Sequence, residues 1–275
     1  MRRNSLVNIV GLMRPQSVGL MILFVYLPII IRTGDWTYAL IQIIPIYLLI
    51  TGEIILNDYI DIEKDKINKA HRPLAAGKVS VLIAKRLIIC LLVGATFSAL
   101  IIYRESVFRM MLFAVVFVIL TVYSVWMNYI ASIKAFLTAL ATVLCLGFVF
   151  SYIGFERKIL YLMIVAFLYI SSRELLMDIR DYEGDKKWGC KTLAVQFGRR
   201  SIYWLSLLFM SLSQGLFLVF FVMQGDEIVL ILWLISLAIL LGAFVLFYLA
   251  DSKNQNRIAL ALWIPMLLTI PSVIL

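Results

Sequence analysis

Residues 37–65 read TYALIQIIPIYLLITGEIILNDYIDIEKD, an apolar run that ends in a series of aspartates. The part from 37 to 57 has the length of about 20 residues that a helix needs to cross a bilayer. Asp58, Asp61 and Asp65 follow, spaced by three and then four residues. Such spacing places side chains on one face of a helix. The stretch therefore predicts a membrane-spanning helix with carboxylates at one end.

The whole chain has the composition of a membrane protein. Its 275 residues are 63% hydrophobic and 15% charged, and its mean hydropathy is +1.00. Soluble domains are typically about 45–50% apolar and about 25% charged. We predict an all-α, multi-pass membrane protein of one domain, 1–275, built from half-repeats of roughly 1–130 and 131–275. Its nine predicted transmembrane helices are 16–32, 37–57, 79–103, 108–126, 129–152, 158–178, 200–223, 227–250 and 258–275.

The distribution of Lys and Arg predicts the orientation of these helices. With the N-terminus in the cytoplasm, 20 of the 25 Lys and Arg residues fall on the cytoplasmic side. Positive residues accumulate on that side of membrane proteins. The two long connections, 58–78 and 179–199, then lie at the cytoplasmic face of the cell membrane. The net charge of +9 is accounted for by this topology and by attraction to anionic lipids, so we expect no nucleic acid partner.

A second acidic segment repeats the spacing of the first. Residues 177–198 read MDIRDYEGDKKWGCKTLAVQFG, and Asp178, Asp181 and Asp185 each lie 120 residues after an aspartate of the first segment. Each segment alone is also compatible with a solvated loop in which Lys and Asp pair on the surface. The identical spacing after the same kind of apolar helix favours an internal repeat whose two halves face each other.

Two facing columns of carboxylates need a counter-charge. His71 is the single histidine of the chain, so a metal site would have to consist of carboxylates, which favours Mg²⁺. Mg²⁺ is typically held by one or two carboxylates together with substrate phosphates. The pattern therefore predicts a diphosphate bound through Mg²⁺, and nearby cations would take up negative charge as the diphosphate leaves. The cations we name are Arg14, Arg72, Lys186 and Lys191.

The two motifs resemble those of the UbiA superfamily of intramembrane prenyltransferases. The first motif, N-D-x-x-D-x-x-x-D followed by R-P, is met by Asn57, Asp58, Asp61, Asp65, Arg72 and Pro73. The second motif, D-x-x-D-x-x-x-D followed by G-x-x-T-L, is met by Asp178, Asp181, Asp185, Gly189, Thr192 and Leu193. The residues of both motifs are most similar to those of the family branch that adds a geranylgeranyl chain to geranylgeranylglyceryl phosphate.

This resemblance implies a helical bundle around a central cavity and Mg²⁺-dependent transfer of an isoprenoid chain from its diphosphate to a lipid or aromatic acceptor. It implies that Mg²⁺ and the diphosphate are held by Asn57, Asp61, Asp65, Asp181 and Asp185. Asp58 and Asp178 would lie close by, and Arg72 and Lys191 would contact phosphate oxygens. Arg14 and Tyr123 are further candidates for binding the substrate.

One departure from the family pattern follows the predicted fourth helix. Many members carry a Y-S-x-x-(L)-K/R segment there. Tyr123 and Ser124 match its start, but Asn128 stands where a cation is often found. Lys134, about two turns further on, is a possible substitute.

Three ionisable residues of interest lie within the predicted helices 37–57 and 158–178. Glu53 precedes Asn57 by four residues, and Glu174 precedes Asp178 by four, with Arg173 beside it. Ionisable residues in spans usually face a cavity or one another. One interpretation is that Glu53 and Glu174 bind or deprotonate the acceptor. The other is a structural pair, Glu53–Arg173 or Arg173–Glu174, that braces the two halves.

Several functions remain open at this point. Prenyl transfer to a lipid alcohol, prenyl transfer to an aromatic ring and acceptor-free cyclisation of the prenyl cation all fit the two motifs. A cation-coupled transporter would place its carboxylates near mid-membrane, whereas these six aspartates lie at helix ends. The motifs identify the chemistry of the donor and leave the acceptor and the chain length undetermined.

Overall fold

The structure is a computed structural model that describes residues 4–126, 131–153, 157–224, 227–250, 254, 255, 258, 261, 262, 264 and 265. Every secondary-structure element within these ranges is a helix. The elements are α1 (Leu6–Leu12), α2 (Pro15–Thr33), α3 (Trp36–Ile60), α4 (Ile62–Asn68), α5 (Val81–Ile102), α6 (Val107–Trp126), α7 (Lys134–Ile153), α8 (Arg157–Arg180), α9 (Tyr182–Lys187), α10 (Leu193–Phe197), α11 (Arg199–Gln224) and α12 (Glu227–Leu249).

Eight of the predicted transmembrane ranges coincide with the long helices α2, α3, α5, α6, α7, α8, α11 and α12. Most of the ninth, 258–275, lies outside the described residues, as do residues 127–130 and with them Asn128. Among the described residues, six helices are long and apolar enough to cross a membrane, namely α3, α5, α6, α8, α11 and α12. The all-α, multi-pass fold is therefore confirmed, and the count of nine transmembrane helices is not.

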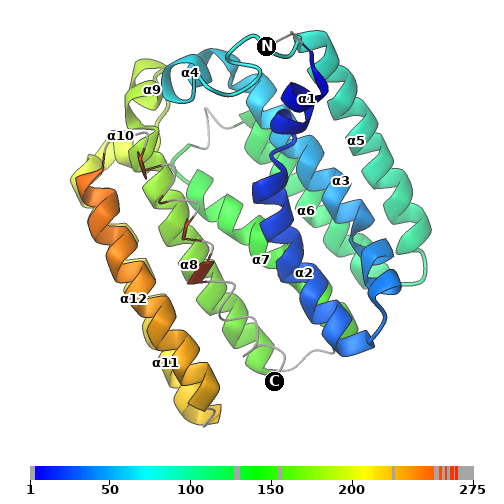
Figure 1. Cartoon of the computed structure of the whole chain (residues 1–275), viewed down its shortest axis with the longest axis vertical. Coiled ribbons are helices and arrows are strands. Elements are labelled where there is room, and N and C mark those ends of the chain that lie inside the picture. The colour runs from blue at the N-terminus through cyan, green and yellow to red at the C-terminus, as the bar shows by residue number, and fades with distance from the viewer. Residues whose placement is uncertain are drawn as a thin grey trace.

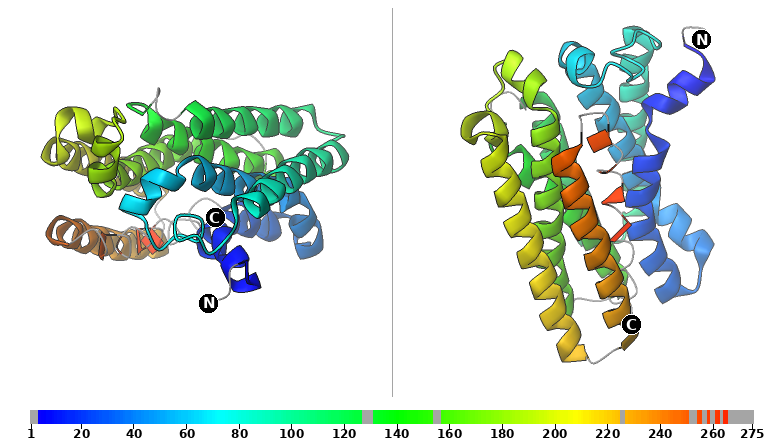
Figure 2. Two further views of the ribbon diagram at one scale, coloured as in Figure 1. Left: turned by 90° about the horizontal axis from the view of Figure 1, so that it is seen from above. Right: turned by 60° about the vertical axis from the view of Figure 1, so that its left-hand side comes forward.

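The long helices lie alongside one another, and the short helices α1, α4, α9 and α10 gather at one end (Figure 1). In the first half of the chain α3 packs against α2, α5 and α6, and in the second half α8 packs against α11. Helix α7 contacts α2, α6 and α8 and so joins the two groups. The view from above shows these groups side by side (Figure 2).

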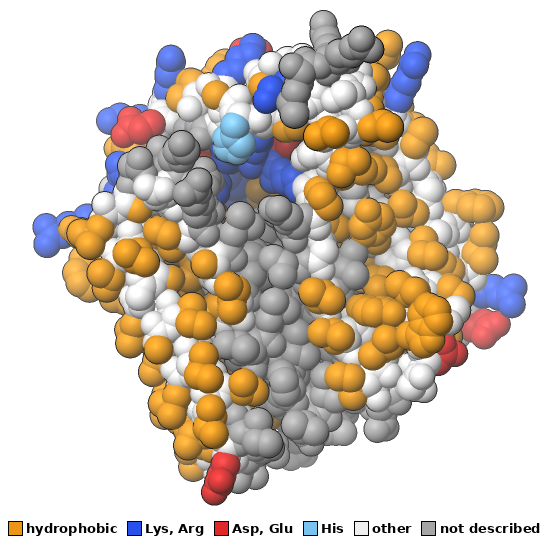
Figure 3. All heavy atoms as spheres, in the orientation of Figure 1, with side chains coloured by type: hydrophobic (Ala, Val, Ile, Leu, Met, Phe, Trp, Pro, Cys, Tyr) orange, Lys and Arg blue, Asp and Glu red, His pale blue; other side chains and the backbone are white. Residues whose placement is uncertain are grey.

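The helices are held together by different contacts in the two halves. In the first half, a Cβ at Gly52 of α3 would lie 2.8 Å from a methyl carbon of Leu92 on α5, so a larger residue there would require the leucine to shift. In the second half, Ser172 of α8 and Ser206 of α11 each donate to the other's backbone carbonyl, at 2.7 and 2.8 Å. Small and polar residues are typical of helix contacts in membranes. Apolar side chains cover much of the outer surface (Figure 3).

Both aspartate motifs follow the same kind of break in a helix. Asp61 caps the end of helix α3 and Asp181 follows helix α8, with φ/ψ of −89°/10° and −88°/3°. The i→i+4 hydrogen bonds continue through each break, from Asp65 N to Asp61 O at 2.8 Å and from Asp185 N to Asp181 O at 3.0 Å. Each predicted column of carboxylates therefore stands on a nearly continuous helix that bends at its middle aspartate. The short helices that follow, α4 and α9, pack against each other.

Candidate functional site

The packing of α4 against α9 brings the two aspartate motifs together at one end of the bundle. All six aspartates are buried, with 1–8% of their surface exposed. Burial of so many like charges requires partners, because an unpaired charge in a low-dielectric environment is costly. The structure supplies cationic side chains from both halves of the chain.

Two arginines form ion pairs with Asp58 and Asp65 of the first motif. Arg72 Nη1 donates to Asp58 Oδ1 at 2.8 Å and also to Asp65. Arg14 forms a second ion pair with Asp58. Arg14 sits at the start of α2 in the left-handed region, with φ of 48°, which is uncommon for a side chain other than Gly, Asn or Asp. A residue held in this strained conformation and aimed at a buried carboxylate is typical of a functional site.

Two lysines join the motifs to each other. Lys64 Nζ lies 3.1 Å from Asp61 Oδ1 and 3.6 Å from Asp185 Oδ1. Lys69 Nζ lies 2.6 Å from Asp181 Oδ2 and 3.7 Å from Asp65 Oδ1. Each lysine therefore contacts one aspartate of each motif.

The second motif has two cations of its own. Arg180 forms a fork on Asp181, with Nε to Oδ1 at 2.8 Å and Nη2 to Oδ2 at 2.9 Å. Lys134, at the start of α7, lies 3.9 Å from Asp178 Oδ1. Lys134, which the sequence offered as a substitute for the cation missing at position 128, also lines the cavity, and its contact with a phosphate stays a prediction.

The charges at this end of the bundle perturb one another. Burial and the neighbouring Arg72 lower the pKa of Lys69 to about 8, against the effect of Asp181. Burial would raise the pKa of Asp181, but Lys69 and Arg180 hold it well below its usual range. Asp185 differs, because its burial outweighs Lys134 and Lys64 and raises its pKa. The two neighbouring carboxylates of one motif therefore differ in how readily they lose a proton.

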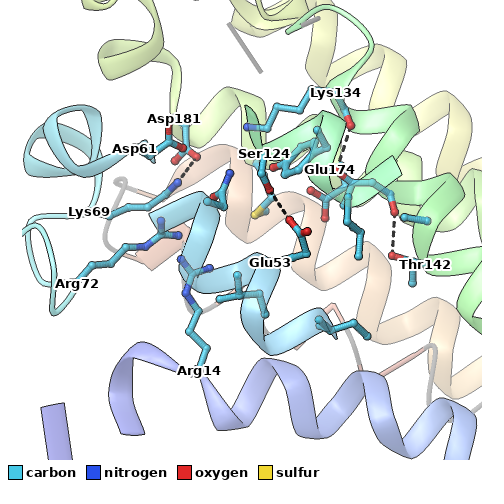
Figure 4. Close-up of a pocket in the computed structure, with 18 of the residues that line it drawn as sticks. Arg14, Glu53, Asp61, Lys69, Arg72, Ser124, Lys134, Thr142, Glu174 and Asp181 are labelled. Carbon is cyan, nitrogen blue, oxygen red and sulfur yellow. Dashed lines mark hydrogen bonds and ion pairs between the residues drawn. The ribbon is translucent and has the colours of Figure 1, made fainter. Parts of the chain in front are cut away.

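A cavity of about 650 Å³ opens beneath this cluster. Known ligand sites have volumes of about 300–1,000 Å³. The polar end of the wall is formed by Arg14, Asn57, Asp61, Lys69, His71, Arg72, Lys134, Arg180 and Asp181, and the deeper wall includes Ile50, Ile54, Leu120, Ala141 and Cys145. Lys69 extends to Asp181, Arg72 enters from the same side as Lys69, and Arg14 approaches from another side (Figure 4). The cavity thus combines a charged end with a wall in which apolar side chains are mixed with a few polar ones.

Glu53 faces this cavity from α3. Thr121 Oγ1 donates to Glu53 Oε1 at 2.6 Å, and Ser124 Oγ donates to Oε2 at 3.0 Å. Glu174, in contrast, forms an ion pair with its neighbour Arg173. Of the two structural pairs considered from the sequence, the structure therefore contains Arg173–Glu174, while two hydroxyl groups fix the carboxylate of Glu53.

The remaining predicted residues lie in different places. Tyr123 and Glu174 belong to the cavity wall. Asp58, Asp65 and Asp178 are buried and pair with cations of the cavity wall. Asp185 is buried and pairs with Lys64. Lys191 is exposed, and its backbone oxygen accepts from Gln196 Nε2 at 2.5 Å. The expected contact between Lys191 and a phosphate stays a prediction.

Sequence reasoning missed three cations of the site, Lys64, Lys69 and Arg180. Lys64 and Lys69 have a local signal, because Lys64 follows Asp61 by three residues and Lys69 follows Asp65 by four. Arg180 is adjacent to Asp181 and lacks this spacing. The spacing of i to i+3 or i+4 indicates that an ion pair can form. Contacts with the opposite motif have no such signal, because they depend on how α4 and α9 pack.

The donor atoms at this end fit a hard cation such as Mg²⁺. Asp58 Oδ2, Asp65 Oδ1, Asp178 Oδ2 and both carboxylate oxygens of Asp185 are buried without a hydrogen-bond donor, and carboxylate oxygens are the ligands that Mg²⁺ prefers. Within the described residues, no three carboxylate, thiol or imidazole side chains gather closely enough to hold a metal ion. These carboxylate oxygens are chemically suited to bind Mg²⁺. In this structure, lysine ammonium groups lie among them.

The fold and the site define a class, a multi-pass helical membrane protein with a carboxylate-rich cavity at one end. The sequence pattern of the UbiA prenyltransferase family matches residues 18–268. The chain belongs to this family. The resemblance that rested on two short motifs is thus confirmed, and the alternative of a cation-coupled transporter is set aside.

Two curated relatives are called digeranylgeranylglyceryl phosphate synthase. The protein from Sulfolobus acidocaldarius is 32% identical over 178 residues, which cover 61% of this chain and 62% of the relative. The protein from Pyrococcus horikoshii is 33% identical over 151 residues, which cover 53% of this chain and 51% of the relative. The chain thus spans about half to three fifths of the length of these relatives.

A solved structure has the same fold. It is a UbiA homolog from Archaeoglobus fulgidus bound to GPP and Mg²⁺, with a TM-score of 0.71 and 19% sequence identity over 97% of this chain and 99% of the other. At this identity the likeness establishes the fold of the present chain.

Proposed function

We propose that this protein transfers a prenyl group, geranylgeranyl, from its diphosphate to a membrane-associated acceptor, geranylgeranylglyceryl phosphate. The observation that carries the proposal is the meeting of both aspartate motifs and their cations at the mouth of a partly apolar cavity. The names of the relatives support the lipid acceptor. The Archaeoglobus structure, which contains GPP and Mg²⁺, supports the donor and the metal.

The diphosphate would bind at the charged end of the cavity. Arg14, Lys69 and Arg72 line this end and would donate to phosphate oxygens, as such groups do at developing negative charge. Asn57, Asp61, Asp65, Asp181 and Asp185 would hold Mg²⁺, which when bound supplies Lewis-acid neutralisation of the leaving diphosphate. Lys191, which is exposed, is the remaining cation proposed to contact the diphosphate.

The reaction breaks the bond between C1 of the prenyl chain and the bridging oxygen, and the electron pair leaves with the diphosphate. The apolar wall at Ile50, Ile54 and Leu120 would exclude water from the allylic cation. The hydroxyl oxygen of the acceptor then bonds to C1. Its proton passes to Glu53, whose carboxylate Thr121 and Ser124 hold in place.

The orientation of the site is part of the same proposal. The Lys and Arg distribution supports a cytoplasmic position for the aspartate end of the bundle. Water-soluble prenyl diphosphate headgroups would reach the cavity from that side. Substituted-cysteine labelling of the exposed Lys66 and Lys187 positions in intact and opened vesicles tests this orientation.

The experiment that tests the function crosses a panel of prenyl diphosphates with lipid and aromatic acceptors. The purified protein is supplied with Mg²⁺, and products are identified by mass spectrometry. The expected result is an ether lipid formed from geranylgeranyl diphosphate and geranylgeranylglyceryl phosphate. An aromatic product, or a cyclic hydrocarbon formed without an acceptor, would assign one of the other two reactions and overturn the proposal.

A further inference from the structure

Lys64 and Lys69 contact the two motifs in a crossed arrangement. Lys64 joins Asp61, the second aspartate of the first motif, to Asp185, the third of the second motif. Lys69 joins Asp65, the third of the first motif, to Asp181, the second of the other. Both lysines are buried, with 7% of their surface exposed. They are therefore internal counter-ions and do not belong to the solvated surface.

Only one half of the chain supplies these lysines. The aspartates recur after 120 residues, but the positions that correspond to Lys64 and Lys69 are Gly184 and Gly189. Gly189 has φ of +70°, and a Cβ there would meet no atom within 4 Å. The two lysines of the first half thus pair with aspartates of both motifs. At the two equivalent positions the second half has glycine, which has no side chain.

The charges of the described cluster balance. Six aspartates form ion pairs with six cations, which are Arg14, Lys64, Lys69, Arg72, Lys134 and Arg180. Each divalent ion that enters alone adds two positive charges to a neutral cluster. A metal ion that enters with a diphosphate brings its own anion. Because like charges repel strongly in a low-dielectric site, the balanced cluster disfavours the metal ion alone.

We propose that Lys64 and Lys69 compete with the divalent cation for the paired carboxylates, so that metal and prenyl diphosphate bind together and the displaced ammonium groups then donate to the diphosphate. This inference rests on the proposed function and specifies how the same site is loaded. Lysine suits the role because its ammonium group sits on a flexible stem and carries three donors that can be redirected.

The test measures Mn²⁺ binding by electron paramagnetic resonance, with the full chain in lipid nanodiscs. Variants Lys64→Met and Lys69→Met are compared with wild type and with Lys66→Met. Lys66 belongs to the same helix, but it is exposed and pairs with Glu63 at 2.5 Å. Each protein is titrated with Mn²⁺ alone and with Mn²⁺ plus geranylgeranyl thiolodiphosphate, which resists ionisation of its C1–S bond.

Removing either buried lysine is expected to tighten binding of Mn²⁺ alone by roughly tenfold and to weaken binding of the thiolodiphosphate by a similar factor. Lys66→Met should change neither affinity. If the affinity for Mn²⁺ alone is unchanged or lower in both folded methionine variants, the proposal is overturned.

A second variant keeps the test decisive if a methionine variant does not fold. Lys69→Arg retains the charge and should leave the affinity for Mn²⁺ alone within about twofold of wild type. A tenfold gain in that variant would contradict competition by charge. The Mn²⁺-only titration needs no substrate, so it stands even if the product assay finds no prenyl transfer, and failure of one is distinguishable from failure of the other.

Discussion

The two aspartate motifs have the same backbone and different surroundings. Both bend at their middle aspartate with nearly identical dihedral angles. The first motif is followed by Lys69 and Arg72, which reach back over the site, whereas the second is followed by Gly189 and an exposed Lys191. The comparison teaches that the carboxylates of this site are repeated while the cations are divided unequally. A substitution in one half is therefore not equivalent to its counterpart in the other.

The largest expected effect comes from the feature that the halves share. Asp61→Asn and Asp181→Asn each remove a charge from the middle of a motif and should both lower Mg²⁺-dependent diphosphate release on the order of 1,000-fold. Glu63→Gln serves as the control, because Glu63 is exposed in the same segment. Undiminished turnover in either aspartate variant would refute the idea that both motifs serve one site.

The next effect separates two glutamates at matching positions. Glu53→Gln should lower the rate of transfer to a hydroxyl acceptor by about 100-fold, because it removes the proposed proton acceptor. Glu174→Gln should affect this rate much less, since Glu174 is paired with Arg173. Single-turnover kinetics measure the rate of the transfer step. An equal loss of this rate in the two variants would show that both glutamates have a structural role.

A smaller effect distinguishes the arginines of the two motifs. Arg180 holds Asp181 by two nitrogens, whereas Arg72 uses Nη1 alone for both of its contacts. Lysine cannot contact one carboxylate with two nitrogens as arginine does, but it can replace a single donor. Arg180→Lys should therefore lower kcat/KM by about tenfold, and Arg72→Lys by less. A larger loss of kcat/KM in Arg72→Lys than in Arg180→Lys would show that the first motif depends more on the geometry of its arginine.

The smallest effect concerns stability outside the site. A Cβ at Gly52 would lie 2.8 Å from Leu92 Cδ2 and 3.2 Å from Leu91 Cβ, whereas at Gly94 it would meet Leu48 Cδ1 at 3.6 Å. Gly52→Ala should destabilise the α3–α5 contact by about 1–3 kcal/mol. Gly94→Ala, in the same interface, should have little effect. Thermal unfolding in detergent compares the two, and equal midpoints would contradict this packing.

Much of the fold follows from local sequence. Runs of about 20 apolar residues form helices because a helix satisfies its backbone hydrogen bonds within one segment in the membrane, and eight predicted ranges became long helices. The 120-residue repeat likewise places aspartates at two helix ends. These features depend on residues close together in the chain, so composition and spacing suffice to predict them.

The pairing within the site depends on the tertiary structure. Lys69 is four residues from Asp65, yet its nearest carboxylate, at 2.6 Å, belongs to Asp181 in the other half of the chain. Glu53 likewise finds its partners on α6, 68 and 71 residues away. Spacing along one helix determines which side chains share a face. The packing of two helices determines which opposite charge each of them meets, and that packing is the sum of many apolar contacts that no short motif encodes.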